Sequence, residues 1–484
     1  MFAPIRRKLV SADLREPPSR AACRERVTTG YMSNFYHTTF SPSTDAILDE
    51  PVAQEALAPQ KSEEQPVWKT RAAQGKYKLF HYVLLAYLFL YCSRLPELFP
   101  KVRASMALTI VLLAGAVATG RGTKIARTKM GKLLIAFTVW TALCVPFSVW
   151  VGGSVDQLKT TVQSVLLAAF VIAFVGTVRE VRNAMYAIGI AMATVAALSL
   201  STFRTNTNLG ERLGFGDTST LRDPNFMSLY ILMGLPFVYM GVTRGKGAFR
   251  VLCLLMIPVM LVAVVHSASR MALILFLVGL GIFLYRASQK ERVAVLLATV
   301  LIAGVTLPVL PSSVTSRFTT FFHSSRGEEA SEAAESAQSR WDLLMRSLEL
   351  TARHPLFGVG PGQFLTGEAN LAKEQGRRRG LWHFTHNAYT QVSSESGIVG
   401  AVLYIMAIVA SYRGLATIRK RGSTLLIREM AKYIQISLWM VIIGGFFLSI
   451  GFGGVSFVIM ALSVSFQLAA AAQMKSMQPE VPTR

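Results

Sequence analysis

Charged residues are scarce in this chain, at 16% of 484 residues, whereas 52% are hydrophobic. A soluble protein of this length carries about a quarter charged residues, so the composition excludes an ordinary soluble globular protein. Acidic residues are especially few, with 27 Asp and Glu against 50 Lys and Arg. A basic balance can indicate nucleic-acid binding, but most of these Lys and Arg lie in short segments between apolar runs. We therefore expect membrane lipids as partners, and no nucleic acid.

Cysteines and several catalytic motifs are also missing or rare. The four cysteines, Cys23, Cys92, Cys144 and Cys253, show neither a pairing pattern nor a metal-ligand spacing, which excludes a disulfide framework. No G-x-S-x-G and no H-E-x-x-H sequence is present, which argues against a serine hydrolase and a zinc protease. The glycine-rich segment 358–362 lacks the Lys-Ser/Thr of a phosphate-binding loop, so we interpret it as a tight turn.

The apolar residues are gathered in runs. Residues 1–76 contain no sustained apolar run and no signal-peptide core, and their composition is typical of a disordered segment. Beyond them, runs close to the ~20 residues that span a bilayer predict an all-α, polytopic membrane protein. The twelve predicted spans lie at about 79–93, 104–120, 133–151, 158–178, 183–202, 225–243, 249–267, 270–286, 293–310, 396–412, 432–450 and 452–472.

Basic residues between the runs predict the orientation. With the N-terminus inside, the connections after the second, fourth, sixth, eighth and tenth spans face the cytoplasm, and all five are basic. The connection after the first span, with Arg94, Lys101 and Arg103, is the exception. The predicted organisation is a disordered cytoplasmic tail (1–76), transmembrane helices 1–9 (77–310), a periplasmic loop domain (311–395), transmembrane helices 10–12 (396–472) and a second cytoplasmic tail (473–484).

Within the loop domain, residues 340–353 are predicted to form an amphipathic helix that His354-Pro355 ends. One face carries the apolar residues Trp341, Leu344, Met345, Leu348 and Ala352 at helical spacing. The other carries Asp342, Arg346, Glu349 and Arg353. Such a helix either lies on the membrane surface or caps the bundle, and the sequence leaves both interpretations open.

A cluster of polar residues lies where this loop returns to the membrane: His383, His386, Asn387 and Tyr389. Ionisable groups at such a boundary are functional candidates, although the histidines would also fit as interfacial anchors beside Trp382. The H-x-x-H spacing suits a metal, but no acidic or cysteine ligand lies close beside it, and a stable site needs three or four ligands. We therefore expect no metal.

Two arginines stand at the predicted outer starts of the sixth and eighth spans, Arg222 and Arg270. A single arginine there can extend to the lipid headgroups without further function. Two of them on the side of the histidines favour a diphosphate ligand, because guanidinium groups bind phosphate oxygens in a bidentate way.

Taken in order, several short segments resemble the O-antigen ligase and O-antigen polymerase superfamily of bacterial envelope glycosyltransferases. They are Arg-Asp-Pro-Asn at 222–225, Ser-Ala-Ser-Arg at 267–270, Arg340-Trp341, the segment 354–362, and His-Asn-Ala-Tyr at 386–389 leading to 395–400. The resemblance implies a metal-independent, cofactor-free glycosyl transfer at the periplasmic face of the inner membrane. The donor would be a glycan on undecaprenyl diphosphate and the acceptor a glycan or lipid A-core sugar, in lipopolysaccharide, O-antigen or exopolysaccharide synthesis.

The resemblance also implies roles for individual residues. Arg222 and Arg270 match the diphosphate-binding arginines, and His386 matches the catalytic histidine because Asn387 follows it. A neutral imidazole is suited to deprotonate an acceptor hydroxyl near pH 7, and a helix starting after His386 would help to keep it neutral. The supporting residues are Asp223, Arg340, His383, Asn387 and Tyr389. Ligase and polymerase are not distinguished, and the alternative is a transporter of lipid-linked glycan, although no internal repeat is obvious.

Overall fold

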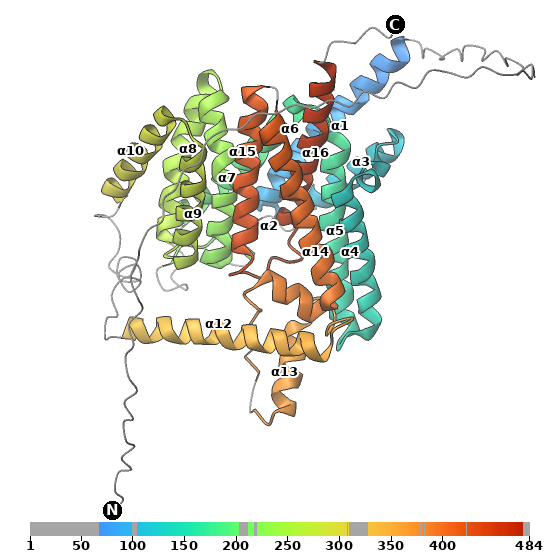
Figure 1. Cartoon of the computed structure of the whole chain (residues 1–484), viewed down its shortest axis with the longest axis vertical. Coiled ribbons are helices and arrows are strands. Elements are labelled where there is room, and N and C mark those ends of the chain that lie inside the picture. The colour runs from blue at the N-terminus through green and yellow to red at the C-terminus, as the bar shows by residue number, and fades with distance from the viewer. Residues whose placement is uncertain are drawn as a thin grey trace, which may run out of the picture. The chain divides into compact units, whose positions relative to one another are not determined.

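A computed structural model describes residues 67–98, 104–202, 212–216, 220–306, 308, 328–377, 380–381, 383–422 and 424–477. They belong to one compact unit, Gln65–Arg484. Every regular element in these ranges is a helix (Figure 1), which confirms the predicted all-α class. The helices are α1 (Val67–Ser93), α2 (Leu95–Leu98), α3 (Ala104–Ala118), α4 (Lys129–Cys144), α5 (Val151–Phe174), α6 (Val178–Thr202), α7 (Pro224–Arg244), α8 (Gly247–His266), α9 (Arg270–Arg286), α10 (Gln289–Thr306), α12 (Glu328–Arg353), α13 (Phe364–Glu374), α14 (Ala388–Arg421), α15 (Leu425–Gly444) and α16 (Gly454–Ser476).

Each of the twelve predicted spans falls on one of these helices. Seven segments among the described residues are long and apolar enough to cross a membrane: Lys129–Phe147, Val151–Phe174, Val178–Ser201, Pro224–Arg244, Gly247–His266, Ala388–Arg421 and Gly454–Ser476. The chain is therefore a multi-pass membrane protein, while the count of twelve crossings stays a prediction. α1 begins at Val67, inside the segment predicted as a disordered tail. The predictions for residues 1–66, Lys101, Arg103 and Trp382 lie outside the described residues.

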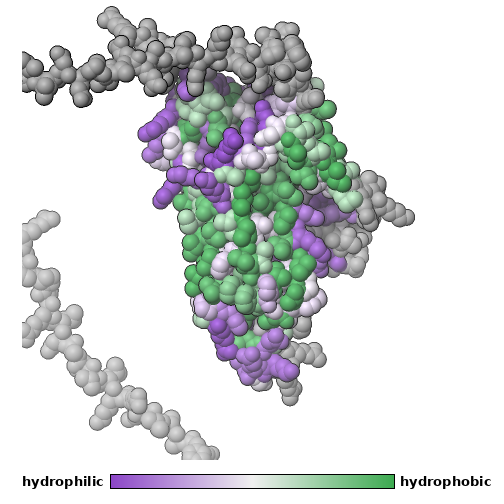
Figure 2. Space-filling model, turned by 90° about the vertical axis from the view of Figure 1, so that its right-hand side faces the viewer, coloured by the Kyte–Doolittle hydropathy of each residue, from purple (hydrophilic) through white to green (hydrophobic). Residues whose placement is uncertain are grey.

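The helix α16 lies at the centre of the bundle. It contacts α4, α5, α6, α14 and α15 and is buried along most of its length. Small residues make this close approach possible, among them Gly454, Ser463 and Ala469. On one side of the described part, Figure 2 shows an apolar belt with hydrophilic residues at both of its ends. This is the distribution that a bilayer selects, because lipid chains cover the belt and water covers its ends.

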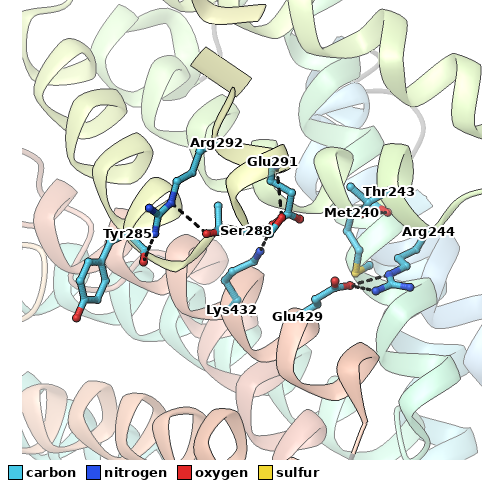
Figure 3. A network of polar contacts seen from close by, with 10 residues as sticks. Met240, Thr243, Arg244, Tyr285, Ser288, Glu291, Arg292, Glu429 and Lys432 are labelled. Atoms are coloured by element: carbon cyan, nitrogen blue, oxygen red, sulfur yellow. Dashed lines mark hydrogen bonds and ion pairs between the residues drawn. The ribbon is translucent and has the colours of Figure 1, made fainter. Parts of the chain in front are cut away.

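An ion-pair network joins the helices at the end of the bundle where α7 finishes and α15 starts (Figure 3). Arg244 at the end of α7 contacts Glu429 of α15 at 2.6 Å. Lys432 of α15 contacts Glu291 in the first turn of α10 at 3.8 Å. These pairs hold α7, α10 and α15 together at the end opposite to the candidate site described below.

Of the three basic residues predicted to follow the first span, the structure describes Arg94, which lies between α1 and α2. Its Nη1 contacts Glu97 at 2.7 Å, and its Nη2 donates to the hydroxyl of Tyr230 in α7 at 2.8 Å. Arg94 has a positive φ of 55°. The charge of Arg94 is thus paired inside the bundle. It therefore does not count among the exposed loop charges that indicate which side of the membrane a loop faces.

The segment 354–362 enters a break in α14, which is where the loop domain joins the bundle. At the break, Gly397 has a φ of 69°, and the carbonyl groups around it lose their helical partners. The N–H of Val359 donates to Ser394 O at 2.8 Å, and the N–H of Gly360 donates to Glu395 O at 3.1 Å. The predicted turn at 358–362 is present, with positive φ at all three glycines, and it also completes the hydrogen bonding of a broken helix.

The amphipathic helix predicted at 340–353 is the second half of α12, and it ends at Arg353 as expected. Its buried side was not predicted. Leu343 and Leu350 are buried in a small cluster with residues of the following loop and α13, whereas the predicted apolar face is exposed, with Trp341 at 58% and Met345 at 49%. Of the residues of α12, this cluster includes only these two leucines, so the wider apolar face stays outside it.

Candidate functional site

The two candidate arginines lie at the starts of adjacent helices. Arg222 ends a short 3-10 turn (Thr220–Arg222) directly before α7, and Arg270 is the first residue of α9. Asp223 caps α7, since its Oδ1 accepts the N–H of Asn225 at 2.7 Å. Ser269 caps α9 in the same way, with its Oγ accepting the N–H of Ala272 at 3.1 Å. Both capping residues belong to types that favour this position.

A side-chain hydrogen bond joins the two helix starts. The hydroxyl of Ser269 donates to Oδ1 of Asn225 at 2.6 Å. The residue before Ser269, Ala268, has a positive φ of 48°, which is costly for a residue other than glycine. The arginines are therefore held beside two helix N-termini, whose partial positive charge favours anions. The roles of Asn225 and Ser269 were not predicted from the sequence, although a serine directly before a helix start is a recognisable capping signal.

His386 stands in a strained turn before α14. It has a φ of 49°, and the turn is fixed on both sides. Thr385 shares a hydrogen bond with Ser449 at 2.8 Å, and the N–H of Ala388 donates to Gly445 O at 2.6 Å. Strain of this kind persists only where the surroundings impose it, and it is concentrated at functional sites.

The helix α14 starts at Ala388, so its positive end lies beside His386 and disfavours the charged imidazolium form. Asn387 caps it, with Oδ1 accepting the N–H groups of Tyr389 at 2.9 Å and Thr390 at 3.1 Å. The side-chain amide oxygen of Asn387 is thus engaged by the first N–H groups of α14. The hydroxyl of Tyr389 donates to Ile442 O in α15 at 2.8 Å, so this side chain fixes α14 against α15.

Arg340 extends from α12 into the same region. The His386 ring lies close enough to Arg340, Asp223 and His383 for their charges to change its pKa. Arg340 is in turn close enough to Arg270 for the two positive charges to repel each other. The structure thus brings together Asp223, Arg270, Arg340 and His386 from α7, α9, α12 and the start of α14. Arg222 is exposed beside this group, and His383 is exposed at its edge.

The electrostatics keep the His386 ring neutral. Burial lowers the pKa of His386 below its usual value, the positive charge of Arg340 lowers it further, and the carboxylate of Asp223 opposes them. Burial also lowers the pKa of Arg340, which nevertheless remains positive at neutral pH because arginine titrates far above it. His386 Nδ1 is buried without a hydrogen-bond partner in the part of the chain that the structure describes, although buried polar atoms are normally paired.

The site combines cationic groups with a neutral base. Guanidinium groups at two helix starts suit a phosphate-bearing ligand, and a neutral imidazole suits proton abstraction. Within the described ranges, no three His, Cys, Asp or Glu side chains lie together in a way that suits a metal ion.

Residues 228–405 match the family model described as O-antigen ligase. The matched segment runs from α7 into α14 and includes Arg270, Arg340 and His386, whereas Arg222 and Asp223 lie a few residues before its start. The chain matches no curated protein. The match supports the resemblance of this segment to the O-antigen ligase and polymerase superfamily that the short motifs indicate.

Proposed function

We propose that the protein transfers a glycan from undecaprenyl diphosphate to an acceptor hydroxyl at the periplasmic face of the bacterial inner membrane. The hydroxyl oxygen attacks C1 of the first donor sugar, and the bond from C1 to the diphosphate oxygen breaks. Undecaprenyl diphosphate leaves with the bonding electrons, and the hydroxyl proton passes to His386. The acceptor is a lipid A-core sugar for a ligase, or a growing glycan for a polymerase.

One observation carries the proposal: cationic and basic groups from four separate parts of the chain lie close together near the starts of α7 and α9. Arg270 and Arg340 lie together with His386, and Arg222 lies at the adjoining start of α7. A diphosphate leaves readily once its negative charge is compensated, and preorganised guanidinium groups provide this compensation without a metal. We assign Arg222 and Arg270 to the diphosphate, with Arg340 as a third cation.

The same geometry supports His386 as the base. The imidazole ring of His386 is neutral, and its Nδ1 has no hydrogen-bond partner among the described residues. The backbone of this residue is strained. A base must lie on the face of the sugar opposite to the leaving diphosphate. His386 lies on the turn before α14, whereas Arg222 and Arg270 lie at the starts of α7 and α9, so the two functions come from different elements.

A deletion strain tests the proposal and distinguishes its variants. Loss of a ligase leaves long glycan on the carrier lipid, and loss of a polymerase leaves single repeat units on the acceptor. Either result supports glycosyl transfer. Accumulation of lipid-linked units that face the cytoplasm would instead indicate a transporter and would overturn the proposal.

A further inference from the structure

The second half of α12 carries an exposed apolar stripe. Trp341 is 58% exposed, Met345 49% and Leu348 46%. Successive residues of a helix are separated by 100°, so these three residues lie on one side, with Ala352 between them and Leu344 next to them. Leu343 and Leu350 lie on the opposite side and are buried in the loop core.

The charged residues of α12 lie between these two sides, toward α13. Arg346 pairs with the buried Glu368 of α13, and Arg353 contacts Glu374 of α13 at 2.9 Å. α13 therefore contacts the polar and buried sides of α12. The exposed apolar stripe faces away from α13, and no described element covers it.

The placement of α12 indicates what the stripe faces. In Figure 1, α12 runs across the direction of the bundle helices, and α13 lies beyond it. Arg340, one residue before Trp341, reaches the charges at the starts of α7 and α9. α12 is therefore level with those helix starts, at the boundary of the apolar bundle surface. The other side of α12 packs on the loop core through Leu350 and on α14 through Thr351, whose hydroxyl lies 2.9 Å from that of Ser393. The stripe therefore faces away from both α13 and α14 and is open at the level of those helix starts.

We propose that α12 lies in the interface of the lipid bilayer, with Trp341, Met345 and Leu348 inserted among the lipids. Tryptophan is favoured at this depth, and a helix with one apolar and one charged side lies in the interface plane. Of the two alternatives that the sequence leaves open, this selects the membrane surface, because a helix that capped the bundle would bury this stripe against protein.

The role of this membrane contact in the reaction rests on the proposed function. Insertion of the stripe fixes Arg340 at the level of the lipid headgroups, where the diphosphate of a lipid-linked donor lies. The lipid surface is then a partner of the site, and Trp341, Met345 and Leu348 position Arg340 without contacting the reacting atoms.

Spin-label accessibility tests the placement without an activity assay. Single cysteines replace Met345 and Leu348, and Glu374→Cys on α13 is the water-exposed control, since its side chain is 63% exposed. The native cysteines are first replaced by alanine, and each variant must keep the elution profile and unfolding temperature of that background. The protein is placed in nanodiscs of phosphatidylethanolamine and phosphatidylglycerol, and relaxation by oxygen is compared with relaxation by a water-soluble nickel chelate.

We expect the labels at 345 and 348 to be relaxed more strongly by oxygen, which concentrates in lipid, and the label at 374 more strongly by nickel. Strong relaxation of 345 and 348 by nickel would place the stripe in water and overturn the proposal. Protection from both reagents would show a protein cover, such as a second copy of the chain, and would also overturn it. Neither of these results affects the proposed transfer reaction, which the deletion strain tests separately.

Discussion

Arg222 and Arg270 differ from ordinary interfacial arginines because each stands beside a capped helix start, and Ser269 and Asn225 tie the two starts together. We predict that Arg222→Ala and Arg270→Ala each lower the rate of glycan transfer by about 10²–10³-fold, the usual cost of removing one electrostatic contact to a transition state. The unfolding temperature should stay close to that of the unchanged protein, since the caps are made by other residues.

Lysine at these positions should restore little of the rate, because a point charge cannot bind two phosphate oxygens side by side. The measurement is the transfer rate of purified Arg270→Lys beside Arg270→Ala. Full activity of Arg270→Lys would show that charge alone suffices.

Charges around His386 predict a pH dependence with a definite sign. The pKa of His386 is lowered, and the base is active only when neutral, so the rate falls as the pH drops through this lowered pKa. Arg340→Gln removes a positive charge and should raise the pKa, which moves the acid limb to higher pH. Asp223→Asn removes a negative charge and should move it to lower pH.

Asparagine caps helices as well as aspartate does, so Asp223→Asn leaves the start of α7 intact. The measurement is kcat against pH with saturating donor for both variants. Shifts in the same direction, or an unchanged acid limb in both, would contradict His386 as the titrating base.

Among the elements, α14 shows what can be learned from the sequence and what cannot. Its apolar part follows from a local signal, and the predicted span at 396–412 lies within α14. The helix itself starts earlier, at Ala388, which the sequence analysis considered only as a condition for a neutral His386. Its break at Gly397 was not predicted, because it depends on the segment 354–362 from a distant part of the chain. The same reason applies to the bond between Asn225 and Ser269. Each residue lies at a helix start that local signals indicate, but their contact joins two separate helices.

The break in α14 predicts a specific sensitivity. Gly397 has a φ of 69°, and a side chain there would collide with the carbonyl oxygen of Leu356. Gly397→Ala should therefore lower the free energy of unfolding by ~1–3 kcal/mol, which is the usual cost of a positive φ for a residue other than glycine. The matched control is Gly281→Ala in α9, where the added carbon meets no atom within 4 Å apart from its chain neighbours and the adjacent backbone of its own helix.

Thermal unfolding of both variants in detergent is the measurement. The control should be unchanged or more stable by about 0.5–1 kcal/mol, since alanine is the better helix former. Equal unfolding temperatures for Gly397→Ala and Gly281→Ala would mean that the break is not required for stability.

For the whole molecule, the sequence predicted the all-α class and the order of the helices, because apolar runs are long and local. It did not predict which side of α12 is buried, because Leu343 and Leu350 pack against Val359, Phe364 and Leu371, which come from later parts of the chain. It brought Arg340 into the site only through the family resemblance, since no local signal places a residue of α12 beside α7 and α9.

The orientation of the whole chain is a separate prediction. α14 starts at the candidate site and ends at Arg421, so Ala330 in α12 and Gly422 after α14 should lie on opposite sides of the membrane. Cysteines at these positions are labelled with a membrane-impermeant maleimide. We expect Ala330→Cys to react from the periplasm and Gly422→Cys only after the inner membrane is opened. Reaction of both from one side would contradict the predicted topology.

The proposed chemistry is tested most directly by the initial rate of glycan transfer from an undecaprenyl-diphosphate donor, measured with purified protein in nanodiscs. His386→Ala is compared with His383→Ala, its neighbour three residues earlier. We predict a loss of at least ~10²-fold for His386→Ala, the usual cost of removing a general base. His383→Ala should keep most of the rate, because the side chain is exposed at the edge of the site. Near-normal transfer by His386→Ala, or an equal loss in both variants, would contradict catalysis by His386.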